Sequence, residues 1–390
     1  MRFPPKNRWK TGKSRDTIQA ETRTEGGSYM NKRFFGRTIA SLLTLTLCAG
    51  MLFGCKTKDA EPQSEAALTE QPARTAEPTA EPTAEPDPTL PKVDLGEYRL
   101  EHSDSENYPY VVRTPHATWY LAAADIALLG EQAYFAGLKT ILHNQEADFT
   151  DAIAVLDGYI KDEVPSIDIH TDFAAKTERA KWNKASAYYL GPETGIYLYY
   201  DWGTSGELLH EYAHYLTYAC CTFDLTPGGG FWAEAIAEYV SKITCQNHMG
   251  RALNFGMSGE EQTYAEQRGL LDADGTINPK KYYCFMAAFI RSGAAIGATY
   301  SAVSETLITL TEQLLEHPML TTISYYEAGS FFNWLVERYG RELVFQNMTI
   351  GQEGFKDVFG EDFETLFFEW AEDNNAWCEG NGIVLGPMEE

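Results

Sequence analysis

The sequence predicts an α+β domain, in which a small mixed sheet in the first half is followed by an all-helical second half. Two patterns support this fold class. Short runs of alternating apolar and polar residues, bounded by turn-forming residues, lie between 166 and 200. From about Phe231 onward, apolar residues recur at the spacing of amphipathic helices. With 390 residues, 44% of them hydrophobic, the chain is long enough to bury a sizeable core.

The individual elements follow from these patterns in chain order. A helix is predicted over 147–162, because its apolar residues share one helical face: Phe149, Ile153, Leu156 and Ile160. The turn signal Gly191-Pro192-Glu193 separates two predicted strands. The expected strands are 166–170, 185–190 and 195–200, and the expected helices begin near 205 and cover 231–240, 281–296, 303–316, 325–340 and 362–373.

An export signal is predicted ahead of the fold. A basic stretch from Met30 precedes an apolar run over 39–53, which is too short and too rich in Thr, Ser and Gly for a membrane-spanning helix. The run ends in Leu-Phe-Gly-Cys, which resembles a bacterial lipobox. We therefore expect 30–55 to be a lipoprotein signal peptide with Cys55 lipidated, which tethers an extracytoplasmic protein to the cell membrane. Residues 1–29 are then a non-native or unstructured extension. A plain signal peptide or an uncleaved anchor is the alternative.

A stalk is predicted over 56–95, between this anchor and a domain over 96–390. The unit Thr-Ala-Glu-Pro repeats from 75 to 86, and a proline every four residues blocks both helix and sheet. The tract is therefore expected to be an extended, charged spacer that lifts the domain off the membrane. A tail without a role is the alternative.

Composition excludes several classes of partner and site. The formal net charge of −25 repels nucleic acid and anionic membrane surfaces, so the body of the protein is expected to bind neither. The 7 cysteines form no regular framework and include no Cys-x-x-Cys pair, which argues against disulfide scaffolding and a cysteine-based zinc site. The adjacent Cys220 and Cys221 are expected to be small buried residues.

A His-Glu-x-x-His motif lies in GELLHEYAHYLTY, residues 206–218. His210 and His214 are four residues apart, so on a helix both imidazoles project from one face at a separation suited to one metal ion. Glu211 follows the first histidine, where its carboxylate can reach a metal-bound water. This pattern is the signature of zinc metallopeptidases. Two ordinary core histidines are the alternative.

Two acidic residues in FWAEAIAEYV, residues 231–240, extend the predicted centre. A site with only two histidines needs a third protein ligand. Glu234 is far enough beyond His214 to return on a second helix as that ligand. Glu238, one turn further, is expected to accept the N–H of a ligating histidine. A solvated helix face is the alternative, although the apolar neighbours would make unpaired acids costly there.

On these residues the chain resembles the gluzincin metallopeptidases, the superfamily of thermolysin and the aminopeptidase-N-like enzymes, over roughly 150–375. Members carry His-Glu-x-x-His followed by a ligating glutamate on the next helix. The resemblance implies a zincin-like catalytic domain in which His210, His214 and Glu234 bind Zn²⁺ and Glu211 is the general base.

The segment SYYEAGSFFNWLVERYG, residues 324–340, adds to this resemblance. In aminopeptidase-N-like enzymes a tyrosine in a Tyr-Glu-Lys-Gly-like context stabilises the oxyanion, and Tyr326-Glu327-Ala328-Gly329 looks like that context. The resemblance therefore implies that Tyr326 is the oxyanion donor, with its neighbour Tyr325 as the alternative. No Gly-x-Met-Glu-Asn segment precedes His210, which favours an endopeptidase or an unusual exopeptidase.

These observations predict a membrane-tethered zinc peptidase that acts on a peptide or protein substrate. Glu211 is expected to take the proton of a metal-activated water and pass it to the leaving amine. The apolar strand 195–200 is expected to be the sheet edge on which a peptide aligns. The competing interpretation is a non-catalytic, lipid-anchored binding or scaffold protein on a metallopeptidase fold. A transporter's solute-binding lipoprotein is disfavoured by the helical second half.

Overall fold

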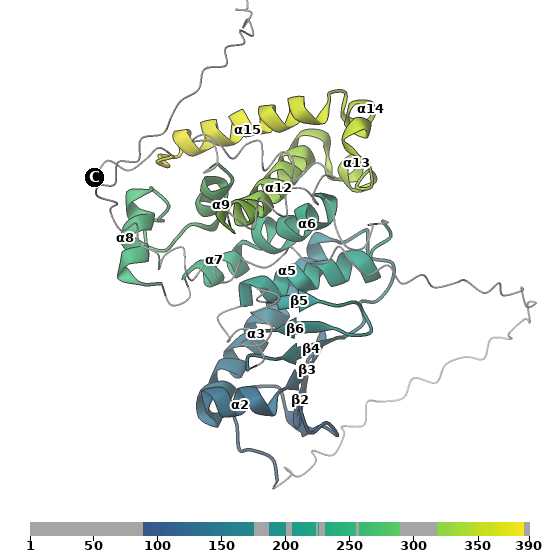
Figure 1. The fold of residues 1–390 in the computed structure, drawn as a ribbon, viewed down its shortest axis with the longest axis vertical. Helices are drawn as coiled ribbons and strands as arrows, with labels where there is room; N and C mark the ends of the chain where they lie inside the picture. Colours follow the sequence, from purple (N-terminus) through teal and green to yellow (C-terminus); the bar gives the residue numbers. More distant parts are fainter. Residues whose placement is uncertain are drawn as a thin grey trace, which may run out of the picture.

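The computed structural model describes residues 89–174, 187–199, 205–223, 225, 231–254, 257–288 and 318–385. The first part of the described chain forms a six-stranded sheet, with two helices between its third and fourth strands, and the rest is helical (Figure 1). The predicted α+β class is therefore confirmed. No helix within these ranges is long and apolar enough to cross a membrane. The predicted extension, the signal peptide with Cys55, the stalk up to residue 88 and the helix at 303–316 lie outside the described residues.

The sheet has the strand order β1-β2-β3-β4-β6-β5. Its strands are β1 (Leu100–His102), β2 (Tyr110–Arg113), β3 (Ala117–Leu121), β4 (Ile167–Thr171), β5 (Ala187–Tyr189) and β6 (Ile196–Leu198). Strands β3, β4 and β6 run parallel, whereas β1, β2 and β5 each pair antiparallel with their neighbours. Strand β5 therefore forms one edge of the sheet.

The helices are α2 (Ala123–Leu129), α3 (Glu131–Val155), α5 (Ser205–Tyr215), α6 (Phe231–Glu238), α7 (Gln246–Asn254), α8 (Gly259–Gln267), α9 (Pro279–Ala288), α12 (Pro318–Tyr339), α13 (Arg341–Phe345), α14 (Phe355–Phe359) and α15 (Phe363–Gly380). Two of them continue as π-helices, α5 into η2 (Leu216–Cys220) and α6 into η3 (Tyr239–Thr244), and a 3₁₀ turn, η5 (Gln352–Gly354), precedes α14. Helix α5 lies between the sheet and the helical layer (Figure 1).

Buried contacts connect the sheet to α5 through α3. The Tyr134 hydroxyl of α3 and the Thr171 hydroxyl of β4 share a hydrogen bond of 2.9 Å, and both residues are fully buried. Further along α3, the Phe149 ring stacks on Tyr212 of α5 with the ring centroids 3.9 Å apart. Because such aromatic packing contributes beyond the area it buries, α3 fixes α5 relative to the sheet.

An aromatic core holds the helical layer together. Phe331 of α12 is fully buried, and its ring contacts Phe231 of α6, Phe355 of α14 and Phe363 of α15. Helix α12 packs along both α6 and α9. The packing of α6 therefore depends on residues more than a hundred positions later in the chain.

The structure confirms most of the predicted elements that it describes and corrects two of them. The strands expected at 166–170, 185–190 and 195–200 are β4, β5 and β6, and α5 begins at Ser205 as expected. The helix expected to reach residue 162 ends at Val155, because Gly158 adopts a φ of +84° in the turn that follows. The expectation that 195–200 is the sheet edge was wrong, since β6 lies between β4 and β5.

Candidate metal centre

Helix α5 carries both histidines of the motif on one buried face. The ring centroids of His210 and His214 are 4.8 Å apart, as the spacing of four residues predicts for a helix. Leu209 and Tyr212 on the same helix are fully buried and hold it in the core. His210, Glu211 and His214 are buried too, and their exposed fractions are 2%, 5% and 6%.

Glu234, in the first turn of α6, completes a three-residue cluster. Its Oε2 lies 3.2 Å from His210 Nε2 and 3.4 Å from His214 Nε2, and the ligand atoms of the three residues lie within 4.8 Å of one another. Around a tetrahedral zinc with bonds of about 2.1 Å, ligand atoms are about 3.4 Å apart. The two distances from Glu234 match this spacing, so the three side chains could hold a metal ion such as zinc. Among the described residues, no other group of three His, Cys, Asp or Glu is close enough to hold a metal.

The charges around the cluster favour a cation. Burial would lower the pKa of His210, but Glu234 and Glu238 outweigh it and raise this pKa to about 10. Burial would likewise raise the pKa of Glu234, but His214 and His210 hold it well below its ordinary value. The buried Glu238 and the partly exposed Glu234 thus flank one imidazole with two carboxylates. A bound cation would neutralise the same negative charge.

Glu238 lies on the far side of His210 from Glu234. Its Oε1 is 3.0 Å from His210 Nδ1 and accepts a hydrogen bond of 2.8 Å from the Lys242 ammonium. Burial would raise the pKa of Glu238, but Lys242 and His210 hold it below its ordinary value. Glu238 and Glu234 therefore flank the His210 ring on opposite sides, Glu238 at Nδ1 and Glu234 at Nε2. The predicted placement of Glu238 beside a ligand histidine agrees with these distances.

Glu211 is held against the sheet edge. Its Oε2 accepts the backbone N–H of Tyr189 in β5 at 2.8 Å, which fixes the carboxylate between α5 and the edge strand. Burial raises the pKa of Glu211, and this effect outweighs the lowering by His214 and His210. A fixed carboxylate with a raised pKa is suited to accepting and releasing a proton.

The structure brings Tyr325, and not Tyr326, to the metal cluster. The rings of Tyr325 and His210 contact edge to face with their centroids 6.1 Å apart. Tyr326 points elsewhere: its ring packs on Tyr283 and lies over the Lys242 ammonium. Adjacent helical residues project about 100° apart, so only one of the two can face the cluster. Of the two candidate oxyanion donors, Tyr325 is therefore the one that lies beside the cluster.

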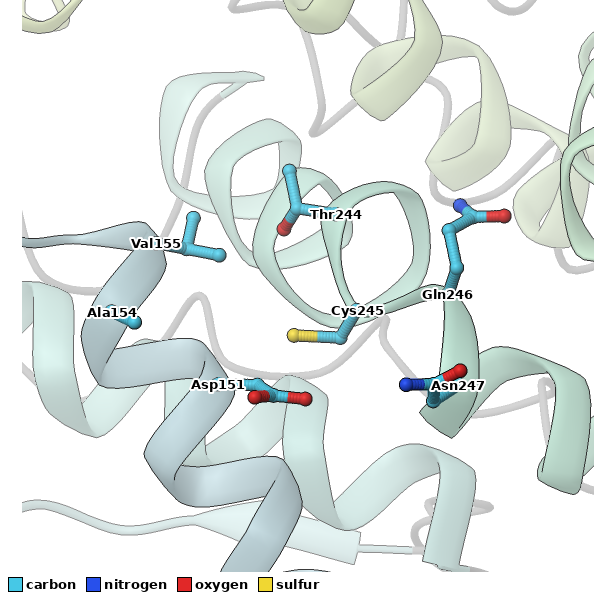
Figure 2. Close-up of a pocket in the computed structure, with 7 residues that line it drawn as sticks. All are labelled: Asp151, Ala154, Val155, Thr244, Cys245, Gln246 and Asn247. Carbon is cyan, nitrogen blue, oxygen red and sulfur yellow. The ribbon is translucent and has the colours of Figure 1, made fainter.

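Other polar features lie apart from this cluster. His248 of α7 is paired with Asp148 of α3 at 2.7 Å, and both residues are buried, so this pair joins the two helices. A pocket of about 410 Å³ lies where α3 meets the start of α7 (Figure 2). It is lined by Asp151, Ala154, Val155, Thr244, Cys245, Gln246 and Asn247, none of which belongs to the metal cluster.

Several neighbours of the cluster were missed from the sequence. Lys242 follows Glu238 by one helical turn, and that spacing could have predicted the pair. The contact of Glu211 with the Tyr189 backbone N–H carries no sequence signal. Tyr218 stacks on the His214 ring with an interplanar angle of 13°, but its place in the π-helix η2 could not be foreseen.

Comparison of the chain with protein-family models, with curated proteins and with solved structures gave no match. The functional interpretation therefore depends on the geometry of the cluster itself.

Proposed function

We propose that the protein is a zinc-dependent peptidase with a zincin-like catalytic domain. One observation carries this proposal: a single carboxylate oxygen of Glu234 lies 3.2 and 3.4 Å from the Nε2 atoms of His210 and His214, on the two helices that a gluzincin site requires. His210, His214 and Glu234 would hold the zinc ion. When bound, zinc would supply Lewis acidity and lower the pKa of a coordinated water.

The chain's own residues then account for proton transfer and charge stabilisation. Glu211 takes the proton of the attacking water and delivers it to the leaving amine, and the Tyr189 N–H keeps its carboxylate in place between these steps. The Tyr325 hydroxyl donates a hydrogen bond to the oxyanion that develops on the scissile carbonyl. Glu238 orients the His210 ring through Nδ1.

The edge strand β5 offers a place for an extended peptide. The Leu190 N–H points inward to Gly195 of the hairpin, so the preceding Tyr189 N–H points outward, where it meets Glu211. A peptide that pairs with this edge would place its backbone beside the general base. Because no segment typical of aminopeptidases precedes α5, we propose cleavage within peptides. The lipid anchor proposed at Cys55 would place this activity at the outer face of a cell membrane.

The test uses the full-length chain, purified in detergent, and its Glu211→Gln variant. We expect one equivalent of zinc in both proteins and cleavage of a peptide library by the wild type alone, because glutamine keeps the ligands and removes the base. Glu361→Gln, an exposed change of the same chemistry, should leave cleavage unchanged. Absence of zinc from the wild type would overturn the proposal, and zinc without cleavage would favour the binding or scaffold role.

A further inference from the structure

Lys242 lies behind the metal cluster, in the π-helix η3 that follows α6. Its side chain is 5% exposed, and its ammonium nitrogen is 2.8 Å from Glu238 Oε1. The Tyr326 ring covers it, with the nitrogen 5.1 Å from the ring centroid. A buried ammonium is costly without an acidic partner, and Glu238 is that partner.

Glu238 is held through both of its carboxylate oxygens. Oε1 is shared between Lys242 and His210 Nδ1, which lies 3.0 Å away. Oε2 accepts a hydrogen bond of 3.4 Å from the Tyr283 hydroxyl. Gly329 of α12 packs so closely on Glu238 Cβ that a methyl group there would lie 2.6 Å from it. Packing and hydrogen bonds therefore leave this carboxylate little freedom.

We propose that Lys242 is a positioning residue of the metal centre. By holding Glu238 Oε1 against His210 Nδ1, its ammonium orients the imidazole so that Nε2 faces Glu234. Lys242 does not touch the ligand atoms and acts through Glu238. This inference rests on the proposed zinc function, and it assigns a role to a residue that neither the His-Glu-x-x-His motif nor the downstream glutamate includes.

The surrounding charges support a permanent cation at this position. Burial would lower the pKa of Lys242, but Glu238 and Glu207 of α5 outweigh it and hold the pKa above its ordinary value. The ammonium therefore stays charged while it contacts Glu238.

The experiment measures the zinc dissociation constant of the full-length chain by competition with a fluorescent chelator. Partners of ligand histidines typically change metal affinity about 10–100-fold, so Glu238→Gln and Lys242→Met should each weaken zinc binding by about tenfold or more. Lys242→Arg, which keeps the charge, should weaken binding less than Lys242→Met. The double variant should bind zinc no more weakly than Glu238→Gln alone, because both changes break the same chain of contacts.

Two further readouts separate positioning from general destabilisation. In the cobalt-substituted protein, Lys242→Met should shift the visible absorption bands of the metal, because the His210 ring changes orientation. Asp148→Asn removes another buried acid with a buried histidine partner, on helices α3 and α7. This control should lower stability and leave zinc affinity and the cobalt spectrum unchanged.

The possible outcomes test the role of Lys242 separately from the proposed zinc function. If the wild type binds zinc and Lys242→Met binds it within about twofold of the wild type, the role of Lys242 is overturned while the zinc proposal stands. The role of Lys242 is also overturned if the losses of zinc affinity caused by Lys242→Met and Glu238→Gln add in full in the double variant. If Lys242→Met does not fold, Glu238→Gln is compared with the double variant: equal affinities support the inference, and a further loss overturns it. A wild type without zinc overturns the proposed function itself.

Discussion

Gly329 occupies the place where α12 crosses α6, and the crossing leaves no room for a side chain. A Cβ added to Gly329 would lie 2.6 Å from Glu238 Cβ and would also overlap the Tyr283 hydroxyl. Real Cβ atoms essentially never approach other atoms within 3.0 Å, so one of these groups must move. The crossing therefore requires glycine, although glycine is unfavourable inside a helix.

We predict that Gly329→Ala destabilises the metal-free protein by about 1–2 kcal/mol. Overpacking typically costs about 1–3 kcal/mol, and two overlapping groups place this site in the upper half of that range. Alanine recovers roughly 1 kcal/mol of helix propensity, which gives the net loss. With an unfolding entropy of about 2.1 cal/mol/K per residue over roughly 300 folded residues, the thermal midpoint should fall by roughly 2–3 °C, measured by circular dichroism. Zinc affinity should fall as well, because Glu238 is displaced.

A second glycine provides the control. A Cβ added to Gly380, at the end of α15, meets nothing within 4 Å. Gly380→Ala should therefore leave the midpoint unchanged or raise it slightly. A midpoint for Gly329→Ala that equals or exceeds that of the wild type would refute the reasoning, because it would mean that α12 can shift at no cost.

Two further predictions concern single side chains. Tyr325→Phe should lower kcat roughly 10²–10³-fold with KM little changed, whereas Tyr326→Phe should leave kcat nearly unchanged. Steady-state kinetics on a cleaved peptide test this prediction. If Tyr326→Phe instead lowers kcat more than Tyr325→Phe does, the oxyanion role belongs to Tyr326. Asp148→Asn should lower the free energy of unfolding at pH 7 by about 3 kcal/mol. Burial would raise the pKa of Asp148, but His248 and Arg251 outweigh burial and hold this pKa below its ordinary value of 3.8. The ionised Asp148 therefore stabilises the fold above pH 3.8, and this stabilisation is lost as the pH falls through the lowered pKa. Denaturant titrations between pH 7 and pH 3 should show the difference between wild type and variant narrowing below about pH 4, and a difference that stays constant would contradict the assignment.

The metal cluster could be predicted because its chemistry restricts the sequence. Two histidines four residues apart share one helical face, and an acid among apolar neighbours needs a charged partner. The motif and this pattern together therefore indicated His210, His214 and Glu234. The choice between Tyr325 and Tyr326 could not be made this way. Their segment is apolar around much of its circumference, and only the packing of α12 against α6 and α9 fixes which side faces His210.

The sheet edge was missed for a similar reason. The runs at 185–190 and 195–200 have the same aromatic, β-prone composition, and nothing within either run indicates which one pairs with β4. The strands β1 to β3 were not predicted at all. Strand order is a property of long-range pairing, which a single sequence does not display.

Both helices that carry the cluster end in π-helices, and this shared feature explains how further residues reach it. A π-helical turn holds one more residue than an α-helical turn and is found frequently at functional sites. Each π segment contains a hydroxyl residue that bonds a carbonyl one turn back: Thr217 bonds Ala213, and Ser241 bonds Ala237. Side-chain hydroxyls can satisfy carbonyls that the wider turn leaves without their usual partners.

The position of each π segment is directly linked to the cluster. Tyr218, within η2, stacks on the His214 ring, and Lys242, within η3, reaches back to Glu238. The wider turns thus bring one side chain from each helix toward a histidine of the cluster or its partner. Such turns are held in place only where tertiary contacts favour them over a regular α-helix. The ring stack on His214 and the ion pair on Glu238 are contacts of this kind, so the His210, His214 and Glu234 cluster and the irregular helix ends support each other.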